Sequence, residues 1–418
     1  MTGTPDHPPG PATVLFAHSG LDWIRGSERC LLDLVAGLDR RHFRPVVWCD
    51  SASLAAEARA LGAEVEQLAG PWPDSGETLL PDRAAVRLAH DVVRRHGARL
   101  VHANNELTLR LLLPAARAAR IPTVVHLHLP TNEADRCYNA VHQAALVVGV
   151  SRSAAQGALD DGMPAGRVRV IYNGVDPRRL SAGDATGLRA SLGIGAGDVV
   201  VAAVGSLIAR KGVDALLHAF ALLRWRDPRA RLLIVGDGVE RPALEALAAS
   251  LGLTGVAHFL GERRDAGAVL RDAADVAVSA AREEAFPLNL LEAALFGLPI
   301  AASAIAPHRE SVVEGVTGLL ATPDDPAALA DALHTLTTDP ALRRRMGEAG
   351  RARVEREFLV THYVQRFEAA YAELLRRPAS SYGWLRGTTW PPVYWRWVAG
   401  VLRRRLGLAP TRRPEPAL

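Results

Sequence analysis

Short apolar segments of strand length alternate with helical segments along almost the whole chain of 418 residues, and this alternation limits the fold more than any other feature. Because the apolar segments are continuous rather than interrupted by polar residues, we expect strands that are buried on both faces. Such strands occur in parallel sheets whose connecting helices cover both sides. The sequence therefore predicts an α/β protein with doubly wound parallel sheets.

The alternation runs in two series, separated by a polar, glycine-rich stretch from Pro177 to Gly197. The first series predicts strands at Val14–Ala17, Val46–Trp48, Leu100–His102, Thr123–Leu127, Leu146–Val150 and Val168–Ile171, and the second predicts them at Val199–Val204, Leu232–Val235, His258–Leu260, Val276–Ser279, Pro299–Ala302 and Gly318–Leu320. We expect a flexible extension at 1–12, Rossmann-like domains at 13–175 and 176–357, a closing helix at 358–377 and a tail at 378–418. Because ligands of such domains bind at the carboxyl ends of the strands, we expect both domains to face one central cleft.

Composition excludes a wholly disordered chain, a fibrous repeat and a polytopic membrane protein. Hydrophobic residues make up 49% and charged residues 22% of the chain, as in soluble globular proteins. The apolar runs are far shorter than the about 18 residues of a membrane span. Cys30, Cys49 and Cys137 lie far apart, which predicts neither a disulfide framework nor a zinc site and favours the cytoplasm. Residues 1–12 lack a basic start and an apolar stretch, so we expect no secretory signal.

The basic charge is concentrated in the tail. Residues 376–418 contain nine Arg and one acidic residue, and subtracting this +8 from the total of +4 leaves −4 for residues 1–375, which argues against nucleic acid as a partner. The tail also holds Trp384, Trp390, Trp395, Trp397, Tyr382, Tyr394 and the run Arg403-Arg404-Arg405. This composition is typical of a segment that binds an anionic membrane surface. We therefore expect residues 382–406 to bind the inner face of the plasma membrane. Packing of these aromatic residues on the N-terminal domain is an equal alternative.

Two adjacent cations follow the first strand of the second domain, in the segment Val204-Gly205-Ser206-Leu207-Ile208-Ala209-Arg210-Lys211-Gly212. Cations at the carboxyl end of a parallel strand suit a phosphate-bearing ligand, whereas the alternative is a basic loop in solvent. Lys211 is the only lysine among 49 Lys and Arg residues. Its compact ammonium group favours the phosphate interpretation, because a guanidinium does not always fit a confined phosphate site.

A second cluster surrounds the start of the helix expected at Leu288–Phe296. Pro287 lies in the first turn of this helix, where the free backbone N–H groups suit a diphosphate. Glu284 precedes the helix and Glu292 lies in its second turn, so that both carboxylates could accept hydrogen bonds from sugar or ribose hydroxyls. The alternative is a capping charge at Glu284 and a solvated side chain at Glu292.

The first domain contributes fewer signals. Gly26 precedes a helical segment, with Ser27 as the expected N-cap. His126 and His128 lie two residues apart at the end of a strand and are expected to share a face.

The segment Gly236-Asp237-Gly238 of the second domain matches a dinucleotide fingerprint only weakly and is equally consistent with a tight turn. G-x-x-x-x-G-K-[ST], H-E-x-x-H and G-x-S-x-G motifs do not occur, which argues against the classes that they define.

Taken together, these segments resemble the retaining glycosyltransferases of family 4, which have the GT-B fold. The resemblance extends from about Val14 to Arg377. It includes Val170–Asp176, Gly205 with Lys211-Gly212, Gly236–Gly238, the E-x7-E pattern Glu284–Glu292 with Gly297 and Pro299, Glu310, Gly315–Leu320, the glycine loop Gly26–Arg29 and His128. Each motif is weak alone, but their order and spacing are specific.

The resemblance implies a transfer of a sugar from a nucleoside-diphosphate sugar to a glycan, lipid-linked or small-molecule acceptor, with retention of configuration and with no metal or cofactor. It implies catalytic roles for His128, Lys211 and Glu284. His128 would reach the donor sugar from the opposite domain, Lys211 would bind the diphosphate, and Glu284 would hold the sugar hydroxyls. The implied substrate-binding residues are Gly26, Ser206, Arg210, Phe286, Pro287, Leu288 and Glu292, the last of which would hold the ribose.

The chain departs from the family pattern at three positions. Ser206 stands where the family often has Arg, Ala285 where it commonly has Gly, and Arg25 where it often has one of two paired glycines. A catalytically silent binding or scaffold subunit is one alternative, and a nucleotide-sugar epimerase or a phosphorylase of similar fold is another. The presence of Lys211, Glu284 and Glu292 together favours the transferase.

Overall fold

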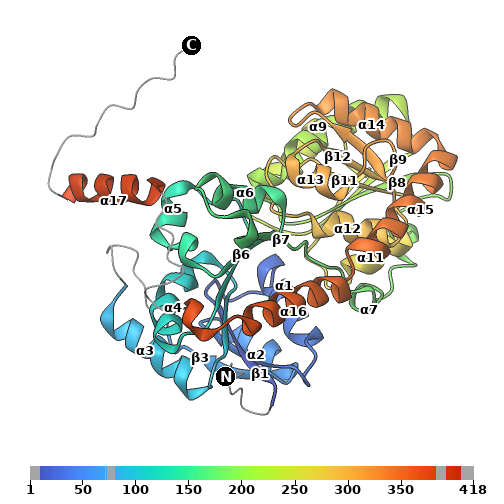
Figure 1. Ribbon diagram of the computed structural model, residues 1–418. Helices are drawn as coiled ribbons and strands as arrows, with labels where there is room; N and C mark the ends of the chain where they lie inside the picture. Colours follow the sequence, from blue (N-terminus) through green and yellow to red (C-terminus); the bar gives the residue numbers. More distant parts are fainter. Residues whose placement is uncertain (1–9, 71, 73–80, 383–391, 406–418) are drawn as a thin grey trace. The chain divides into compact units, whose positions relative to one another are not determined.

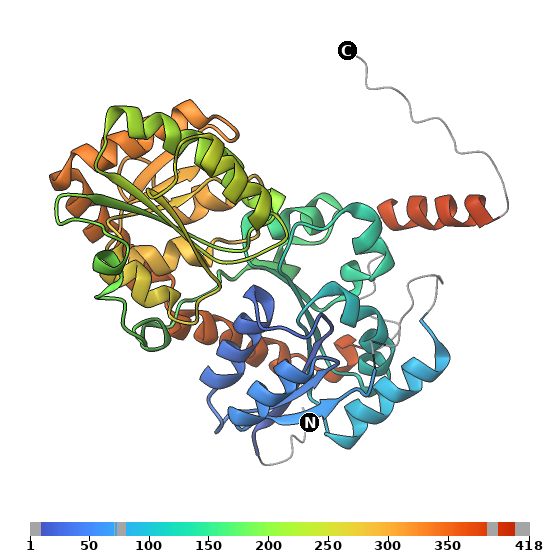
Figure 2. The same cartoon turned by 180° about the vertical axis from the view of Figure 1, so that it is seen from behind.

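The computed structural model describes residues 10–70, 72, 81–382 and 392–405, and the chain divides into two compact units (Figures 1 and 2). The first unit comprises the residues up to Ile171 and those from Val364 onward, and the second comprises Tyr172–Tyr363. Each unit contains one parallel sheet with helices on both faces, which confirms the predicted class of two doubly wound α/β domains. The chain enters the second unit at Tyr172, whereas the sequence places the boundary after residue 175.

The sheet of the first unit has seven strands in the order β3-β2-β1-β4-β5-β6-β7. The strands are β1 (Ala12–His18), β2 (Phe43–Cys49), β3 (Glu64–Gln67), β4 (Leu100–Ala103), β5 (Thr123–Leu127), β6 (Leu146–Gly149) and β7 (Val168–Val170). The helices are α1 (Gly26–Gly37), α2 (Ala52–Ala60), α3 (Arg83–Arg95), α4 (Glu106–Ala119), α5 (Glu133–Tyr138), α6 (Arg152–Asp160) and α17 (Pro392–Arg405), with 3-10 turns η1 (Val141–Gln143), η2 (Ala165–Arg167) and η4 (Ala379–Tyr382). Because the strand order reverses direction between β1 and β4, the carboxyl ends of these two strands form the switch point where ligands of such sheets bind.

Alternate residues of β1 pack on opposite sides of this sheet. Leu15 and Ala17 join the apolar cluster formed with helices α3 and α4. On the other side, the ring of Phe16 packs edge-on against Tyr371 of α16 (Val360–Arg376). The hydroxyl of Tyr371 lies 2.6 Å from Nδ1 of the buried His102, so that the second face also contains a polar pair. Both faces of β1 are therefore covered, as its continuous apolar sequence predicts.

The sheet of the second unit has six strands in the order β10-β9-β8-β11-β12-β13. The strands are β8 (Val199–Val204), β9 (Ala230–Val235), β10 (Ala257–Gly261), β11 (Val276–Ser279), β12 (Ile300–Ser303) and β13 (Gly318–Ala321). The helices are α7 (Pro177–Leu180), α8 (Leu188–Ser191), α9 (Val213–Arg226), α10 (Arg241–Ser250), α11 (Ala266–Ala273), α12 (Leu288–Leu295), α13 (Ala306–Ser311), α14 (Pro326–Thr338) and α15 (Pro340–Glu357), with η3 (Ala209–Lys211). Here the switch point lies between β8 and β11.

The stretch from Pro177 to Gly197, expected to be a polar link, is instead a packed part of the second unit. It forms α7 and α8, and the guanidinium of Arg271 on α11 donates hydrogen bonds to the carbonyl oxygens of Ser181 and Gly183. Within the described residues, no helix is both long and apolar enough to cross a bilayer.

Candidate active site

The two loops that follow β8 and β11 meet at the switch point of the second unit. The ammonium of Lys211, at the end of η3, forms an ion pair with the carboxylate of Glu284, in the loop after β11. Both side chains are largely buried, with 17% of Lys211 and 10% of Glu284 exposed. Arg210 lies farther out, and its guanidinium is 3.8 Å from Glu284 and donates to the carbonyl oxygen of Glu283 at 3.2 Å. Three of the residues predicted for donor binding are thus neighbours, although 73 positions separate Lys211 from Glu284.

Arg282 holds the two loops together. Its guanidinium donates to both carboxylate oxygens of Asp214 at 2.9 and 2.7 Å and to Asp324 at 2.7 Å. It also donates to the carbonyl oxygen of Ala209, while its backbone N–H donates to the carbonyl oxygen of Arg210 at 2.8 Å. The hydrogen bonds to Asp214 raise the pKa of Arg282 further above its usual range and lower that of Asp214. This fully charged clamp fixes the loop that carries Lys211 relative to the loop that carries Glu284.

The start of α12 is anchored by side chains on both sides. The ring of Phe286 is buried, stacks on Tyr172 with the ring centroids 5.1 Å apart and contacts Phe358. Pro287 is the N-cap, and the amide of Asn289 donates to the carbonyl oxygen of Val204 at the end of β8 at 2.8 Å. These contacts hold the first turn of α12, with its backbone N–H groups, beside the carboxyl end of β8.

The remaining predicted residues of the second unit lie around the same point. Leu288 is the first residue of α12, and its N–H donates to the carbonyl oxygen of Phe286. Glu292 lies half-buried in the second turn of this helix. Ser206 lines a small hollow with Gly205, Lys211, Ser279 and Asn289. The hollow therefore joins the ends of β8 and β11 to the ion pair.

His308 of α13 is a polar residue near this site that the sequence analysis missed. It is buried, with its Nδ1 atom 2.7 Å from the carbonyl oxygen of Ser303 and its Nε2 atom 3.5 Å from the hydroxyl of Ser279. Burial, assisted by the charge of Lys211, lowers the pKa of His308 to about 4, although the hydrogen bond to the backbone of Ser303 and the charge of Glu284 act in the opposite direction. His308 is consequently neutral at pH 7 and donates from Nδ1 to the carbonyl group.

The pKa of His308 predicts a pH-dependent stability. Because the unfolded residue titrates at about 6.5 and the folded one at about 4, only the unfolded chain binds the proton between these values. The free energy of unfolding should fall by about 2–3 kcal/mol from this residue as the pH drops from 6.5 to 4. In His308→Gln, urea unfolding followed by circular dichroism should show a shallower pH dependence over this window. An unchanged slope would contradict the assignment.

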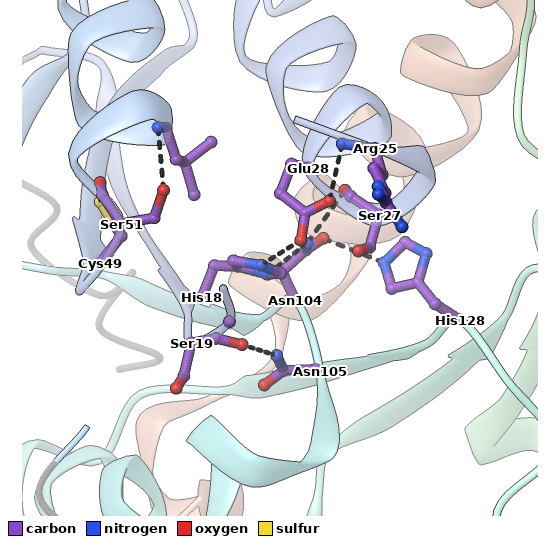
Figure 3. A network of polar contacts seen from close by, with 12 residues as sticks. His18, Ser19, Arg25, Ser27, Glu28, Cys49, Ser51, Asn104, Asn105 and His128 are labelled. Carbon is purple, nitrogen blue, oxygen red and sulfur yellow. Dashed lines mark hydrogen bonds and ion pairs between the residues drawn. The ribbon is translucent and has the colours of Figure 1, made fainter. Parts of the chain in front are cut away.

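The switch point of the first unit carries a buried network of polar side chains (Figure 3). Nε2 of His18, at the end of β1, is 2.9 Å from Oε1 of Glu28, and Nδ1 of His18 is 3.0 Å from the amide nitrogen of Asn104, which follows β4. The same nitrogen donates to the carbonyl oxygen of Ser27 at 3.2 Å, and the amide oxygen of Asn104 is 3.2 Å from Nε2 of His128. The amide of Asn104 thus connects the segment after β4 with the end of β1, the start of α1 and the residue after β5.

The start of α1 differs from the prediction. Arg25 rather than Ser27 is the N-cap residue, and its N–H donates to Oε2 of Glu28 at 3.0 Å. Gly26 is the first helical residue, so that Ser27 lies within the first turn and contributes only its carbonyl group to the network. Burial alone would raise the pKa of Glu28, but its hydrogen bonds with His18 and with backbone N–H groups lower it to about 2. Glu28 is therefore an anion at neutral pH.

His126 and His128 lie on the same side of β5, as the alternation of a strand predicts. Their ring centroids are 4.1 Å apart, and His126 is buried while His128 is half-buried. Burial, followed by the neighbouring His126, lowers the pKa of His128 well below its usual value. His128 and Gly26 both belong to the first unit, whereas the other predicted site residues belong to the second. Within the described residues, no group of three or more His, Cys, Asp or Glu is placed to hold a metal ion.

Two family models match successive parts of the chain. The model described as Glycosyltransferase Family 4 matches residues 24–179, and that described as Glycosyl transferases group 1 matches residues 184–353.

Among curated proteins, the D-inositol 3-phosphate glycosyltransferase of Frankia alni is 38% identical over 199 residues, which are 44% of this chain and 49% of that protein. The N-acetyl-alpha-D-glucosaminyl L-malate synthase of Bacillus anthracis is 29% identical over 236 residues, which are 56% and 61% of the two chains. The matched region thus spans about half the length of the curated relatives. Among solved structures, HepE of Anabaena in complex with UDP and glucose is 25% identical with a TM-score of 0.73, and the match covers 87% of this chain and all of that one.

Proposed function

The chain belongs to glycosyltransferase family 4, and from this premise we propose that it transfers a sugar, of the hexosyl type, from a nucleoside-diphosphate sugar to a hydroxyl group of an acceptor. The observation that carries the proposal is the pairing of Lys211 with Glu284 at the carboxyl ends of β8 and β11. This is the switch point of the sheet, where the ligands of doubly wound domains bind. A buried cation beside a helix start suits a diphosphate, and a buried carboxylate suits sugar hydroxyls.

In the proposed reaction, Lys211 binds the diphosphate as the bond to the sugar breaks, and Arg210 and the first turn of α12 assist. Negative charge grows on the leaving group, so its electrostatic stabilisation is the main contribution of these residues to catalysis. Glu284 would then exchange Lys211 for the hydroxyls of the donor sugar, and Glu292 would hold the ribose. The acceptor attacks from the face that the diphosphate leaves, which retains the configuration of the sugar.

We propose that Lys211 and the helix start neutralise the diphosphate without a bound metal ion. Turnover should then be the same in the presence of excess EDTA as with added Mg²⁺ or Mn²⁺. Loss of turnover in EDTA that a divalent ion restores would contradict this part of the proposal.

UDP is the first donor nucleotide to test, because HepE of Anabaena was crystallised with UDP and glucose. Relatives named for D-inositol 3-phosphate and for L-malate differ in acceptor, so the acceptor panel should contain glycans, lipid-linked sugars and small hydroxyl compounds. A silent scaffold subunit and an epimerase are the competing functions, and neither predicts sugar transfer to a second molecule.

Thermal denaturation with a panel of nucleoside diphosphates tests the proposal. A ligand at 100 times its Kd stabilises the native state by about 2.7 kcal/mol. We expect at least one diphosphate to raise the Tm of the wild type, and the corresponding monophosphate to raise it less. In Lys211→Ala, the diphosphate and the monophosphate should have the same effect on the Tm. The proposal fails if every nucleoside diphosphate leaves the Tm unchanged.

We further propose that α17 brings this protein from the cytoplasm to an anionic membrane surface. Part of the helix packs as the alternative interpretation expects, because Tyr394 contacts His142 and Trp397 contacts Tyr138, with ring centroids 4.8 and 6.4 Å apart. Trp395 and Leu402, however, are 58% and 45% exposed and lie two helical turns apart. Arg396 and Arg403, the next residues along the chain, are exposed as well, so that the exposed part of α17 combines apolar and basic groups. Trp384 and Trp390 lie outside the described residues.

The double variant Trp395→Ser/Leu402→Ser tests the membrane proposal. We expect it to lose flotation with vesicles that contain phosphatidylglycerol, while the wild type floats with these and not with vesicles of phosphatidylcholine alone. The matched control is Leu222→Ser/Trp225→Ser, which removes a Leu and a Trp of at least equal exposure from α9, where Leu222 is 45% and Trp225 90% exposed. Equal flotation of all three proteins, or none by the wild type, would contradict the proposal.

A further inference from the structure

Asn104 occupies the centre of the network in the first unit, and its contacts fix which end of its amide group donates. The carbonyl oxygen of Ser27 can only accept a hydrogen bond, so the atom of Asn104 that lies 3.2 Å from it must be the amide nitrogen. The amide oxygen therefore points to Nε2 of His128, 3.2 Å away. Because this oxygen can only accept, Nε2 of His128 must carry the proton that is donated.

The orientation of the amide depends in turn on His18 and Glu28. The amide nitrogen of Asn104 also lies 3.0 Å from Nδ1 of His18, so that Nδ1 has to be the unprotonated, accepting atom of that ring. The proton of His18 is then on Nε2, which donates to Oε1 of Glu28 at 2.9 Å. The ionised carboxylate only accepts, and it selects this tautomer. All four polar contacts are satisfied by one arrangement of protons.

The same arrangement leaves one atom of His128 for a ligand. With the proton on Nε2, the neutral ring has a lone pair on Nδ1, and Nδ1 makes no hydrogen bond within the described part of the chain. His128 is half-buried, so that part of this residue remains accessible. An accepting nitrogen takes a hydroxyl group as donor, whereas the opposite tautomer would present an N–H group, which can only donate to the hydroxyl oxygen and would require the hydroxyl to turn.

We propose that Asn104, His18 and Glu28 are positioning residues that hold His128 in its Nε2–H tautomer, so that Nδ1 accepts a hydrogen bond from a hydroxyl group of the donor sugar. This inference rests on the proposed function and adds to it the means by which the first unit recognises the sugar. These residues form a relay of hydrogen bonds, Glu28–His18–Asn104–His128, in which two side chains lie between Glu28 and His128 (Figure 3).

Glu28→Gln tests the relay from its far end. The carboxamide can donate to Nε2 of His18, which permits the opposite tautomer of His18 and removes the constraint on Asn104. Selective ¹⁵N labelling of histidine, with the His128 signals assigned by their absence in His128→Gln, reports which ring nitrogen carries the proton. We expect the wild type to show protonated Nε2 only, and Glu28→Gln to show a mixture of tautomers.

The matched control is Asp22→Asn, the same change of carboxylate to amide in the same unit. Asp22 accepts hydrogen bonds from the hydroxyl of Ser51 and the N–H of Ser53, and within the described residues it forms no hydrogen bond or ion pair with a member of the relay. We expect the tautomer of His128 to be unchanged in this control. If Glu28→Gln does not fold, Asn104→Leu, which removes the acceptor of His128 directly, replaces it with the same expected result.

Binding measurements distinguish failure of the inference from failure of the proposed function. With one neutral hydrogen bond to the sugar lost, Glu28→Gln should lower kcat/KM for the donor about 5- to 10-fold, while the affinity for UDP, which lacks the sugar, stays at the wild-type value. A wild type that binds no nucleoside diphosphate would refute the proposed function. Normal UDP binding together with an unchanged tautomer and unchanged sugar recognition in the variant would refute the relay alone.

Discussion

Lys211→Ala should lower turnover about 10²- to 10³-fold, which corresponds to about 3–4 kcal/mol of transition-state stabilisation. The ammonium group is held at the end of β8 by the clamp of Arg282, so it needs little reorganisation when charge develops on the leaving diphosphate. The free energy of unfolding should fall by only about 1 kcal/mol, because the ion pair with Glu284 is neither fully buried nor fully exposed and Arg210 remains 3.8 Å from the carboxylate. Steady-state kinetics and urea unfolding separate the two effects.

Lys211→Arg and a surface control complete this prediction. The planar guanidinium is wider than the ammonium and should displace the phosphates, so that turnover stays clearly below that of the wild type even though the charge is kept. Arg226→Ala removes an exposed cation of α9 that forms an ion pair with Asp331, and it should leave turnover unchanged. Full activity of both Lys211 variants would contradict the assigned role.

Gly236→Ala should lower the free energy of unfolding by about 2–5 kcal/mol, because two costs add at this position. Gly236 follows β9 with a φ of +139°, a conformation that other residues rarely adopt. A Cβ atom there would lie 1.9 Å from the carbonyl oxygen of Gly205, which opens the loop that carries Lys211. The turn and this loop are also joined by the hydrogen bond from the N–H of Leu207 to the carbonyl oxygen of Asp237. UDP affinity should therefore fall together with stability.

Gly187→Ala is the matched control for this change. Gly187 has a φ of −81°, and no heavy atom of another part of the chain lies within 4 Å of the position of a Cβ. The free energy of unfolding of Gly187→Ala should differ from that of the wild type by less than about 0.5 kcal/mol. Equal stability of the two variants would show that Gly236 is not required for close packing.

The sequence predicts most of the sheet because buried parallel strands are continuous apolar segments. β8 and β11 coincide with their predictions, Val199–Val204 and Val276–Ser279. β3 was missed because Glu64–Gln67 contains two Glu residues and pairs on one side only, with β2. An edge strand of this kind carries no apolar signal. The short helix α13 was missed because its six residues, Ala306–Ser311, contain no run of apolar residues, and His308 was missed with it.

The site was predicted in parts rather than as a whole. Motif spacing identified Lys211 and Glu284 separately, but their ion pair depends on the adjacency of β8 and β11, which only the strand order provides. Asn104 and His18 were missed, although each is a polar residue at the end of an apolar strand, and that position was a usable signal. The tautomer of His128 could not be predicted from the sequence, because it depends on the contacts of one amide with three partners.

The most direct test of the central claim uses the single lysine of the chain. Reductive methylation with ¹³C-formaldehyde keeps the charge and labels only the ε-amino group of Lys211 and the terminal α-amino group, which serves as internal control. If Lys211 binds the diphosphate of the donor, adding UDP should shift the ¹³C signal of Lys211, with saturation at the concentration that raises the Tm, and should leave the α-amino signal in place. A Lys211 signal that does not move while UDP saturates the protein would contradict the account.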